Sequence, residues 1–293
     1  LILIACSVAA QDEDTQADAD TQSSLVERYI ENFRTASLDT KATILETSGS
    51  EPTEEMAPLY NEALSFLVSN ANDIPRNTKL QEMSAFVVDK LTEAEYAPAA
   101  ERLWRLFRVQ RETTARIDIL KAVEATGTDN EQVVIYLNQW ISDQNGTRAA
   151  GGEVDRQVLH QAVVTAGNLG SSSSFPILLE TRLLRISDRI TTAAEEALRS
   201  LEGTPTDQAI TALQKRDPEE KREAFDYLME SDLYNEDQRP IIAQAALNEA
   251  LQSTVSDPTV TSELRQLRYE AANVIRAAAF TEATRTMIRH FNQ

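Results

Sequence analysis

The stretch that decides the fold runs from Glu153 to Gly203 and reads EVDRQVLHQAVVTAGNLG, SSSSFPILLE, TRLLRI and SDRITTAAEEALRSLEG. It predicts three short helices with tight joints. In the last of them, small and apolar residues recur at the spacing of a single helical face. They are Ile190, Ala193, Ala194, Ala197, Leu198 and Leu201. Ser187 or Asp188 can cap the first amides of this helix, and Gly203 can take the left-handed conformation that ends it.

The two preceding segments have the same character. One helix is predicted to be closed by Gly167 and Gly170, and its apolar face consists of Val158, Ala162, Thr165, Ala166 and Leu169. The next covers Phe175 to Ile186, with Pro176 in its first turn, where a missing amide costs nothing. Small residues on these faces let a neighbouring helix approach closely. Short amphipathic helices in a row cannot bury their apolar faces alone, so the pattern predicts a solenoid of stacked helix pairs.

At this point the chain resembles a known family. The segment AGNLG at 166–170, followed by FPILLE at 175–180, is similar to the joint in HEAT-like repeat proteins. Ser187 to Leu201 resembles the family's helix with the signature Asp-Pro-x-Val-Arg-x-x-Ala-x-x-Ala-Leu, although Thr191 stands where the family has an arginine. The segment DPEEKREA at 217–224 resembles the same signature, with Lys221 at the arginine position.

The resemblance covers about Val154 to Tyr234 and is specific for fold rather than for function. It implies an all-α fold, an α-solenoid of antiparallel helix pairs with a period of about 40 residues. Gly49, Gly127, Gly167 and Gly203 agree with that period, since they are expected to end alternate helices.

Residues 25–293 are therefore predicted to form one HEAT-like α-solenoid. The expected helices are Leu25–Thr35, Leu38–Thr47, Glu54–Ser69, Asn77–Leu91, Tyr96–Val109, Thr113–Ala125, Glu131–Ser142, Glu153–Leu169, Phe175–Arg185, Asp188–Leu201, Thr206–Lys215, Pro218–Met229, Asp237–Leu251, Thr261–Phe280 and Glu282–Phe291. The residues 143–152 are expected to form an irregular loop, because they contain Asn-Gly and Gly-Gly pairs. The serine run at 171–174 is expected to be a linker.

The first 24 residues differ in composition from the rest. Residues 1–10 are apolar, too short to span a bilayer, and look like the remnant of an export signal. Cleavage after Ala10 is favoured because the apolar run continues past Cys6, but lipidation at Cys6 remains the alternative. Residues 11–24 are acidic and predict a disordered leader. Either reading of the signal predicts an exported protein, periplasmic or associated with the envelope.

Motifs for catalysis or for metal binding are missing from the sequence. His160 and His290 are the only histidines and Cys6 is the only cysteine, so histidine- or cysteine-based metal centres are not expected. The sequence contains no phosphate-cradling glycine loop and no nucleophile elbow. We therefore expect no catalytic residue, no metal and no cofactor.

Charge narrows the class of partner. The chain carries 47 acidic and 28 basic residues, a formal net charge of −19. Such a charge disfavours nucleic acid as a partner, because its phosphates are bound by clusters of Lys and Arg. The acidic candidates for partner binding are Glu195, Glu196, Glu220, Glu223 and Asp226, and the basic candidates are Arg102, Arg105 and Arg108.

The function expected from these features is that of a non-enzymatic, exported scaffold or adaptor that binds another protein through one face of the solenoid. Two alternatives stay open. One is a HEAT-like lyase or chaperone-type enzyme acting on a client protein, since some HEAT-like proteins are similar to chromophore lyases. The other is a structural envelope protein tethered by lipid at Cys6. No integral membrane segment is expected.

Overall fold

The computed structural model describes residues 25–203 and 205–292. The predicted export signal, the acidic leader and Cys6 lie outside the described residues. The chain divides into two compact units, residues 1–133 and 134–293, and each is taken by itself below.

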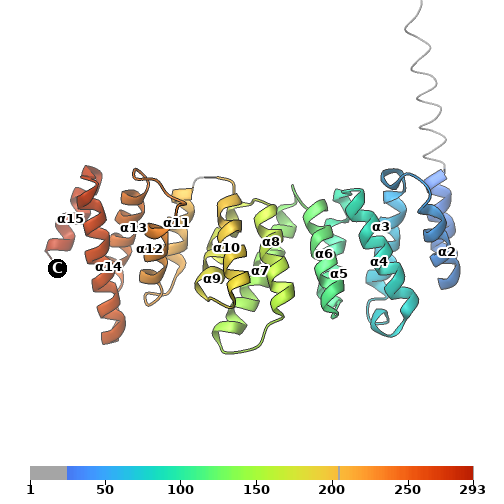
Figure 1. Cartoon of the computed structure of the whole chain (residues 1–293), viewed down its shortest axis with the longest axis horizontal. Coiled ribbons are helices and arrows are strands. Elements are labelled where there is room, and N and C mark those ends of the chain that lie inside the picture. Colours follow the sequence, from blue (N-terminus) through green and yellow to red (C-terminus); the bar gives the residue numbers. More distant parts are fainter. Residues whose placement is uncertain (1–24, 204, 293) are drawn as a thin grey trace, which may run out of the picture. The chain divides into compact units, whose positions relative to one another are not determined.

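The first unit is built from helices that lie side by side (Figure 1). A helix over residues 25–35 is followed by the elements α2 (Leu38–Ser48), α3 (Thr53–Ser69), η1 (Ile74–Arg76), α4 (Thr78–Glu93), η2 (Ala97–Ala99), α5 (Ala100–Val109) and α6 (Thr113–Thr126). α3 packs against α4 and α5 against α6, while α3 also packs against α5 and α4 against α6. Alternate helices therefore line up in two layers, and the core lies between the layers.

The second unit repeats this plan. Its elements are α7 (Glu131–Ala149, which begins at the end of the first unit), α8 (Arg156–Asn168), η3 (Ser172–Ser174), α9 (Phe175–Leu183), α10 (Asp188–Ser200), α11 (Pro205–Lys215), α12 (Lys221–Glu230), α13 (Arg239–Gln252), α14 (Pro258–Ala277), η4 (Thr281–Ala283) and α15 (Thr284–Phe291). α9 packs against α10 and α13 against α14. Within a layer, α8 contacts α10, α9 contacts α11, α11 contacts α13 and α12 contacts α14.

The all-α prediction is confirmed, because the described residues contain helices and turns and no strand. The even-numbered helices, which are the second members of the helix pairs, begin at regular intervals of 32 to 43 residues. They are α2, α4, α6, α8, α10, α12 and α14, and they begin at residues 38, 78, 113, 156, 188, 221 and 258. The predicted apolar face of α10 is confirmed too: Ile190, Ala194 and Ala197 are buried.

One joint recurs three times with the same spacing. Glu95, Gly170 and Ala279 each adopt a left-handed φ, of 46°, 68° and 50°. Each stands two residues after the end of an even-numbered helix (α4, α8 or α14), and a 3₁₀ turn follows two residues later. Each 3₁₀ turn then leads directly into the next helix. The serine run predicted as a linker is one of these turns.

A buried lysine also recurs. Lys41, near the start of α2, donates its Nζ to the carbonyl oxygens of Phe33 and Arg34. Lys221, at the start of α12, donates to the carbonyl oxygens of Leu213 (2.6 Å) and Gln214 (3.3 Å). These carbonyls end the preceding helix and lack helical partners, so each ammonium group satisfies them and compensates for its own burial.

Two predictions about helix ends are wrong. The irregular loop expected at 143–152 is mostly helical, because α7 continues to Ala149. Asn145 is fully buried, and its Nδ2 donates to Thr181 Oγ1 of α9 at 2.9 Å, so a tertiary hydrogen bond outweighs the local turn preference. Gly203 does have a left-handed φ, but α10 already ends at Ser200, and Gly167 lies inside the last turn of α8 rather than after it.

Candidate docking groove

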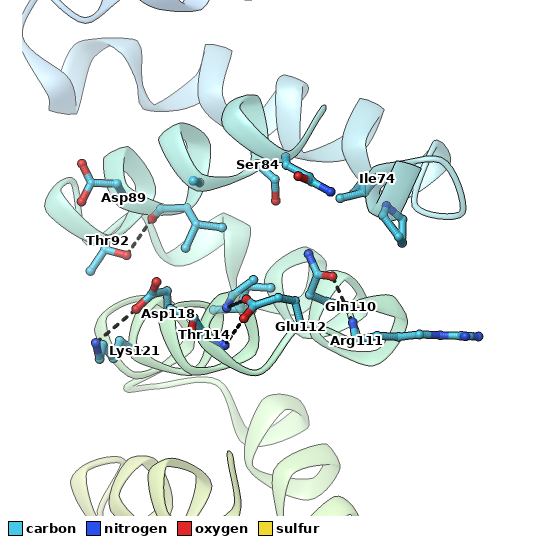
Figure 2. A pocket seen from close by; sticks show the side chains of 16 residues that line it. Ile74, Ser84, Asp89, Thr92, Gln110, Arg111, Glu112, Thr114, Asp118 and Lys121 are labelled. Atoms are coloured by element: carbon cyan, nitrogen blue, oxygen red, sulfur yellow. Dashed lines mark hydrogen bonds and ion pairs between the residues drawn. The ribbon is translucent and has the colours of Figure 1, made fainter. Parts of the chain in front are cut away.

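A groove of about 930 Å³ lies between α4 and α6 of the first unit (Figure 2). It is closed at one end by η1 and by the loop that joins α5 to α6. The groove exists because the positions that face it are small, notably Ser84 and Ala85 on α4 and Ala115 on α6. Two adjacent helices with larger side chains at these positions would close over it.

The floor of the groove is apolar. Ile74, Val88 and Ile119 line it and are otherwise buried in the core. Their position follows from the helical spacing of the two helices, since Val88 stands four residues after Ser84 and Ile119 four residues after Ala115. These side chains are only 1–4% exposed, so the floor of the groove is the surface of the core itself.

The rim is polar, and most of its charged groups already have partners. Glu112 caps α6: its carboxylate accepts from the amides of Thr114 (2.9 Å) and Ala115 (2.5 Å). Asp118 accepts from Lys121 Nζ at 3.1 Å. Neutral groups with free hydrogen-bonding capacity complete the rim, among them Gln81 on α4.

Such a surface can hold an extended chain. An extended segment leaves its backbone amides and carbonyls unpaired, and side chains such as Gln81, Gln110 and Thr114 can satisfy them from both walls. The lining of α4 from Gln81 to Thr92 spans roughly 16 Å at about 1.5 Å per residue. That length matches about five residues of extended chain at about 3.3 Å each.

The acidic residues predicted for partner binding are found on α10 and α12 of the second unit, with Glu220 at the N-cap of α12, and four of the five carry arginine partners. Glu195 pairs with Arg182 (3.1 Å), Glu220 with Arg216 (3.2 Å), Glu223 with Arg185 (3.2 Å) and Asp226 with Arg222 (3.8 Å). Glu196 is exposed. Docking through this acidic face stays a prediction, but its charge is partly neutralised within the chain.

Glu195, one of the predicted partner-binding residues, does not lie on an open face. Its side chain is only 29% exposed, and the Arg182 guanidinium that it contacts lies 4.3 Å from the centre of the Tyr227 ring. Glu195 is therefore part of the packing between α9, α10 and α12, because Arg182 links all three.

Asp226 belongs to a network that the sequence did not reveal. Arg222 of α12 donates to Glu263 (2.8 Å) and Glu270 (3.2 Å) of α14, and Asp226 lies beside it. Burial first, and then the neighbouring Glu270 carboxylate, raise the pKa of Asp226 to about 6, although Arg222 opposes them. Three carboxylates thus share one guanidinium between two helices.

The basic candidates on α5 differ in their surroundings. Arg102 donates to Asn61 Oδ1 at 3.0 Å and is half-buried. Arg105 is exposed and lies 3.8 Å from Glu101. These two line a hollow of about 290 Å³ with Asn130, whereas Arg108 is exposed and does not contribute to it. The three arginines therefore do not form a single site.

The two histidines lie in packed surroundings. His160 in α8 is half-buried, and burial followed by the charge of Arg189 lowers its pKa. His290 in α15 is buried and packs edge-on against Tyr269, with ring centres 5.6 Å apart. Within residues 25–203 and 205–292, no group of three or more His, Cys, Asp or Glu side chains is placed to hold a metal ion.

Comparison with known proteins adds little. No protein family matches the chain, and no curated protein matches it either. One solved structure, described as "Computational Design of Self-Assembling Cyclic Protein Homooligomers", aligns with 96% of this chain and 93% of its own at 12% identity, with a TM-score of 0.16. That score is too low to support an argument. Among the described helices, none has the length and apolar character needed to cross a membrane.

Proposed function

We propose that this protein is a non-enzymatic, exported adaptor of the HEAT-like repeat type, which binds an extended segment of another protein in the groove between α4 and α6. The groove itself is the observation that carries the proposal. It combines an apolar floor with hydrogen-bonding side chains on both walls, which is the chemistry that an extended chain requires.

The remaining support comes from the layered helix pairs and from the first ten residues. Repeated helix pairs expose one layer of helices along their length, and such surfaces are suited to binding extended partners. The apolar residues 1–10 support export. The ion-paired carboxylates on α10 and α12 are less suited to be the main docking surface, because an incoming basic partner would have to displace arginines that already contact them.

Photo-crosslinking in cells tests the proposal. A photoreactive amino acid at Gln81, which lines the groove, is compared with the same residue at Glu82, its exposed neighbour outside it. We expect a discrete protein adduct from position 81 that is weak or missing from position 82. The adduct should also disappear when Ala85→Trp fills the groove. Equal adducts from both positions, or adducts that survive Ala85→Trp, would rule out the groove as the docking site.

A further inference from the structure

Two of the charged side chains that line the α4–α6 groove have no partner within the described chain. Five charged side chains line it, and three of these are satisfied within the chain: Glu112 caps α6, and Asp118 pairs with Lys121. In the part of the chain that the structure describes, the side chains of Asp89 and Arg111 have no ion pair and no hydrogen bond. Both are exposed to solvent.

These two groups lie at opposite ends of the groove. Figure 2 shows Asp89 beside Thr92 and the Asp118–Lys121 pair at one end, and Arg111 beside Gln110 and Ile74 at the other. When only the two groups without a partner are counted, the groove has an acidic end and a basic end, separated by the apolar floor. A charged ligand would meet a different sign at each end, which favours binding in one direction.

We propose that the occupant of the groove is an extended segment of a partner protein with a basic side chain at the Asp89 end and an acidic side chain at the Arg111 end. This inference rests on the proposed function. Between its two charges the segment carries small or branched apolar side chains at alternate positions, because in an extended chain these point to one side, here the floor over Val88 and Ile119. A segment with its two charges in the reverse order would place its acidic side chain against Asp89 and its basic side chain against Arg111.

Selection from a library of random ten-residue peptides tests this before the partner is identified. The library is selected on the full chain, on the groove-filled variant Ala85→Trp, and on a double variant in which the two end charges are reversed, Asp89→Lys with Arg111→Asp. A matched double variant, Glu82→Lys with Arg108→Asp, makes the same change of charge at exposed positions outside the groove. Far-ultraviolet circular dichroism confirms that each variant is folded.

We expect the peptides selected on the unmodified chain to share a fixed order of one basic and one acidic residue, and to be lost on Ala85→Trp. The order should reverse on the charge-reversed variant and stay unchanged on the matched control. Neutralising either charge of a selected peptide should weaken binding up to about fivefold, the upper range for an exposed ion pair.

Two other outcomes would contradict different parts of this account. Peptides that depend on the groove but show no fixed order of charge, or keep their order on the charge-reversed variant, would overturn this inference and leave the adaptor function standing. A selection that yields no groove-dependent peptide would contradict the adaptor function, and this inference with it.

Discussion

Gly167 of α8 lies directly against Ala197 of α10, so closely that a methyl group at Gly167 would come within 2.6 Å of the Ala197 Cβ. Ser200 reinforces the contact, because its Oγ donates to the Gly167 carbonyl oxygen at 2.8 Å. The distance is shorter than carbon atoms can tolerate, so the seam between these two helices depends on the missing side chain. The small residues in the sequence predicted such a close approach.

Replacing Gly167 by Ala should therefore destabilise the protein. The methyl group must push α8 and α10 apart, at a cost of about 1–3 kcal/mol for overpacking. Most of this range exceeds the gain of about 1 kcal/mol that Ala normally brings to a helix interior. Urea unfolding followed by circular dichroism measures the difference.

Gly146 provides the matched control. It also lies inside a helix, α7, but a Cβ there would meet nothing within 4 Å. Gly146→Ala should stabilise the protein by about 0.5–1 kcal/mol, since only the helix preference changes. Ala197→Gly should partly rescue Gly167→Ala. If both glycine variants shift stability in the same direction, the close seam is not present in solution.

The three left-handed joints give a second prediction. Ala279 carries a conformational penalty at φ 50° that a glycine would not, so Ala279→Gly should stabilise the protein by up to about 1 kcal/mol. Gly170→Ala introduces the same penalty at φ 68° and should destabilise it by a similar amount. Thermal or urea unfolding of the two variants checks the opposite signs. A stabilising Gly170→Ala would contradict the left-handed assignment.

These joints also show why the sequence predicted the fold well but not its details. The positions of the helices and the buried face of α10 follow from apolar periodicity, but the helix ends do not. Gly170 marked one joint, but Glu95 and Ala279 hold the same backbone conformation without being glycine, so composition could not reveal that the joint repeats. Asn145 read as a turn residue because its hydrogen-bond partner, Thr181, lies 36 positions further along the chain.

A third prediction separates two adjacent carboxylates of α10. Glu195→Arg places a like charge against Arg182 in a half-buried setting, so it should cost about 1 kcal/mol or more. Glu196 lies on the exposed side of the helix, so Glu196→Arg should lower the unfolding free energy by less than about 0.5 kcal/mol. Urea unfolding of the two variants at low salt makes the comparison. Equal costs would mean that the Arg182 contact contributes nothing to stability.

Asp226 gives a prediction about pH. Its pKa is raised to about 6 in the folded chain, above the value of 3.8 for a free aspartate, so the folded state binds its proton more tightly. The stability that this group contributes is therefore fully present below pH 4 and is lost as pH rises through 6. As pH falls from 7 to 5, the unfolding free energy of the unmodified chain should therefore rise relative to that of the Asp226→Asn variant.

Asp232 controls for the general effect of removing a carboxylate. Its hydrogen bond from Arg199 lowers its pKa, so its contribution is present above the unfolded pKa and is lost as pH falls through the folded one. Asp232→Asn should therefore show no change relative to the unmodified chain between pH 7 and 5. If Asp226→Asn behaves in the same way, the carboxylate network of α12 and α14 does not shift Asp226.

The docking groove lay beyond sequence reasoning for a physical reason. A groove forms where two helices both present small residues, and Ser84 and Ala85 become significant only once Ala115 is known to face them. In the sequence of a single helix, the same residues look like ordinary positions of its solvent-facing side. The charges were equally ambiguous, because a sequence does not show that Asp118 is paired with Lys121 whereas Asp89 is not.

The most direct test of the adaptor account is the affinity of the partner segment once crosslinking has identified it. A fluorescent peptide of that segment is titrated with the unmodified chain, with Ala85→Trp in the groove and with Glu82→Trp on the same helix outside it. The account predicts that Ala85→Trp weakens binding by at least about tenfold, roughly 1.4 kcal/mol, while Glu82→Trp leaves it unchanged. Equal affinity for all three proteins would contradict the account, since the partner would then bind elsewhere on the chain.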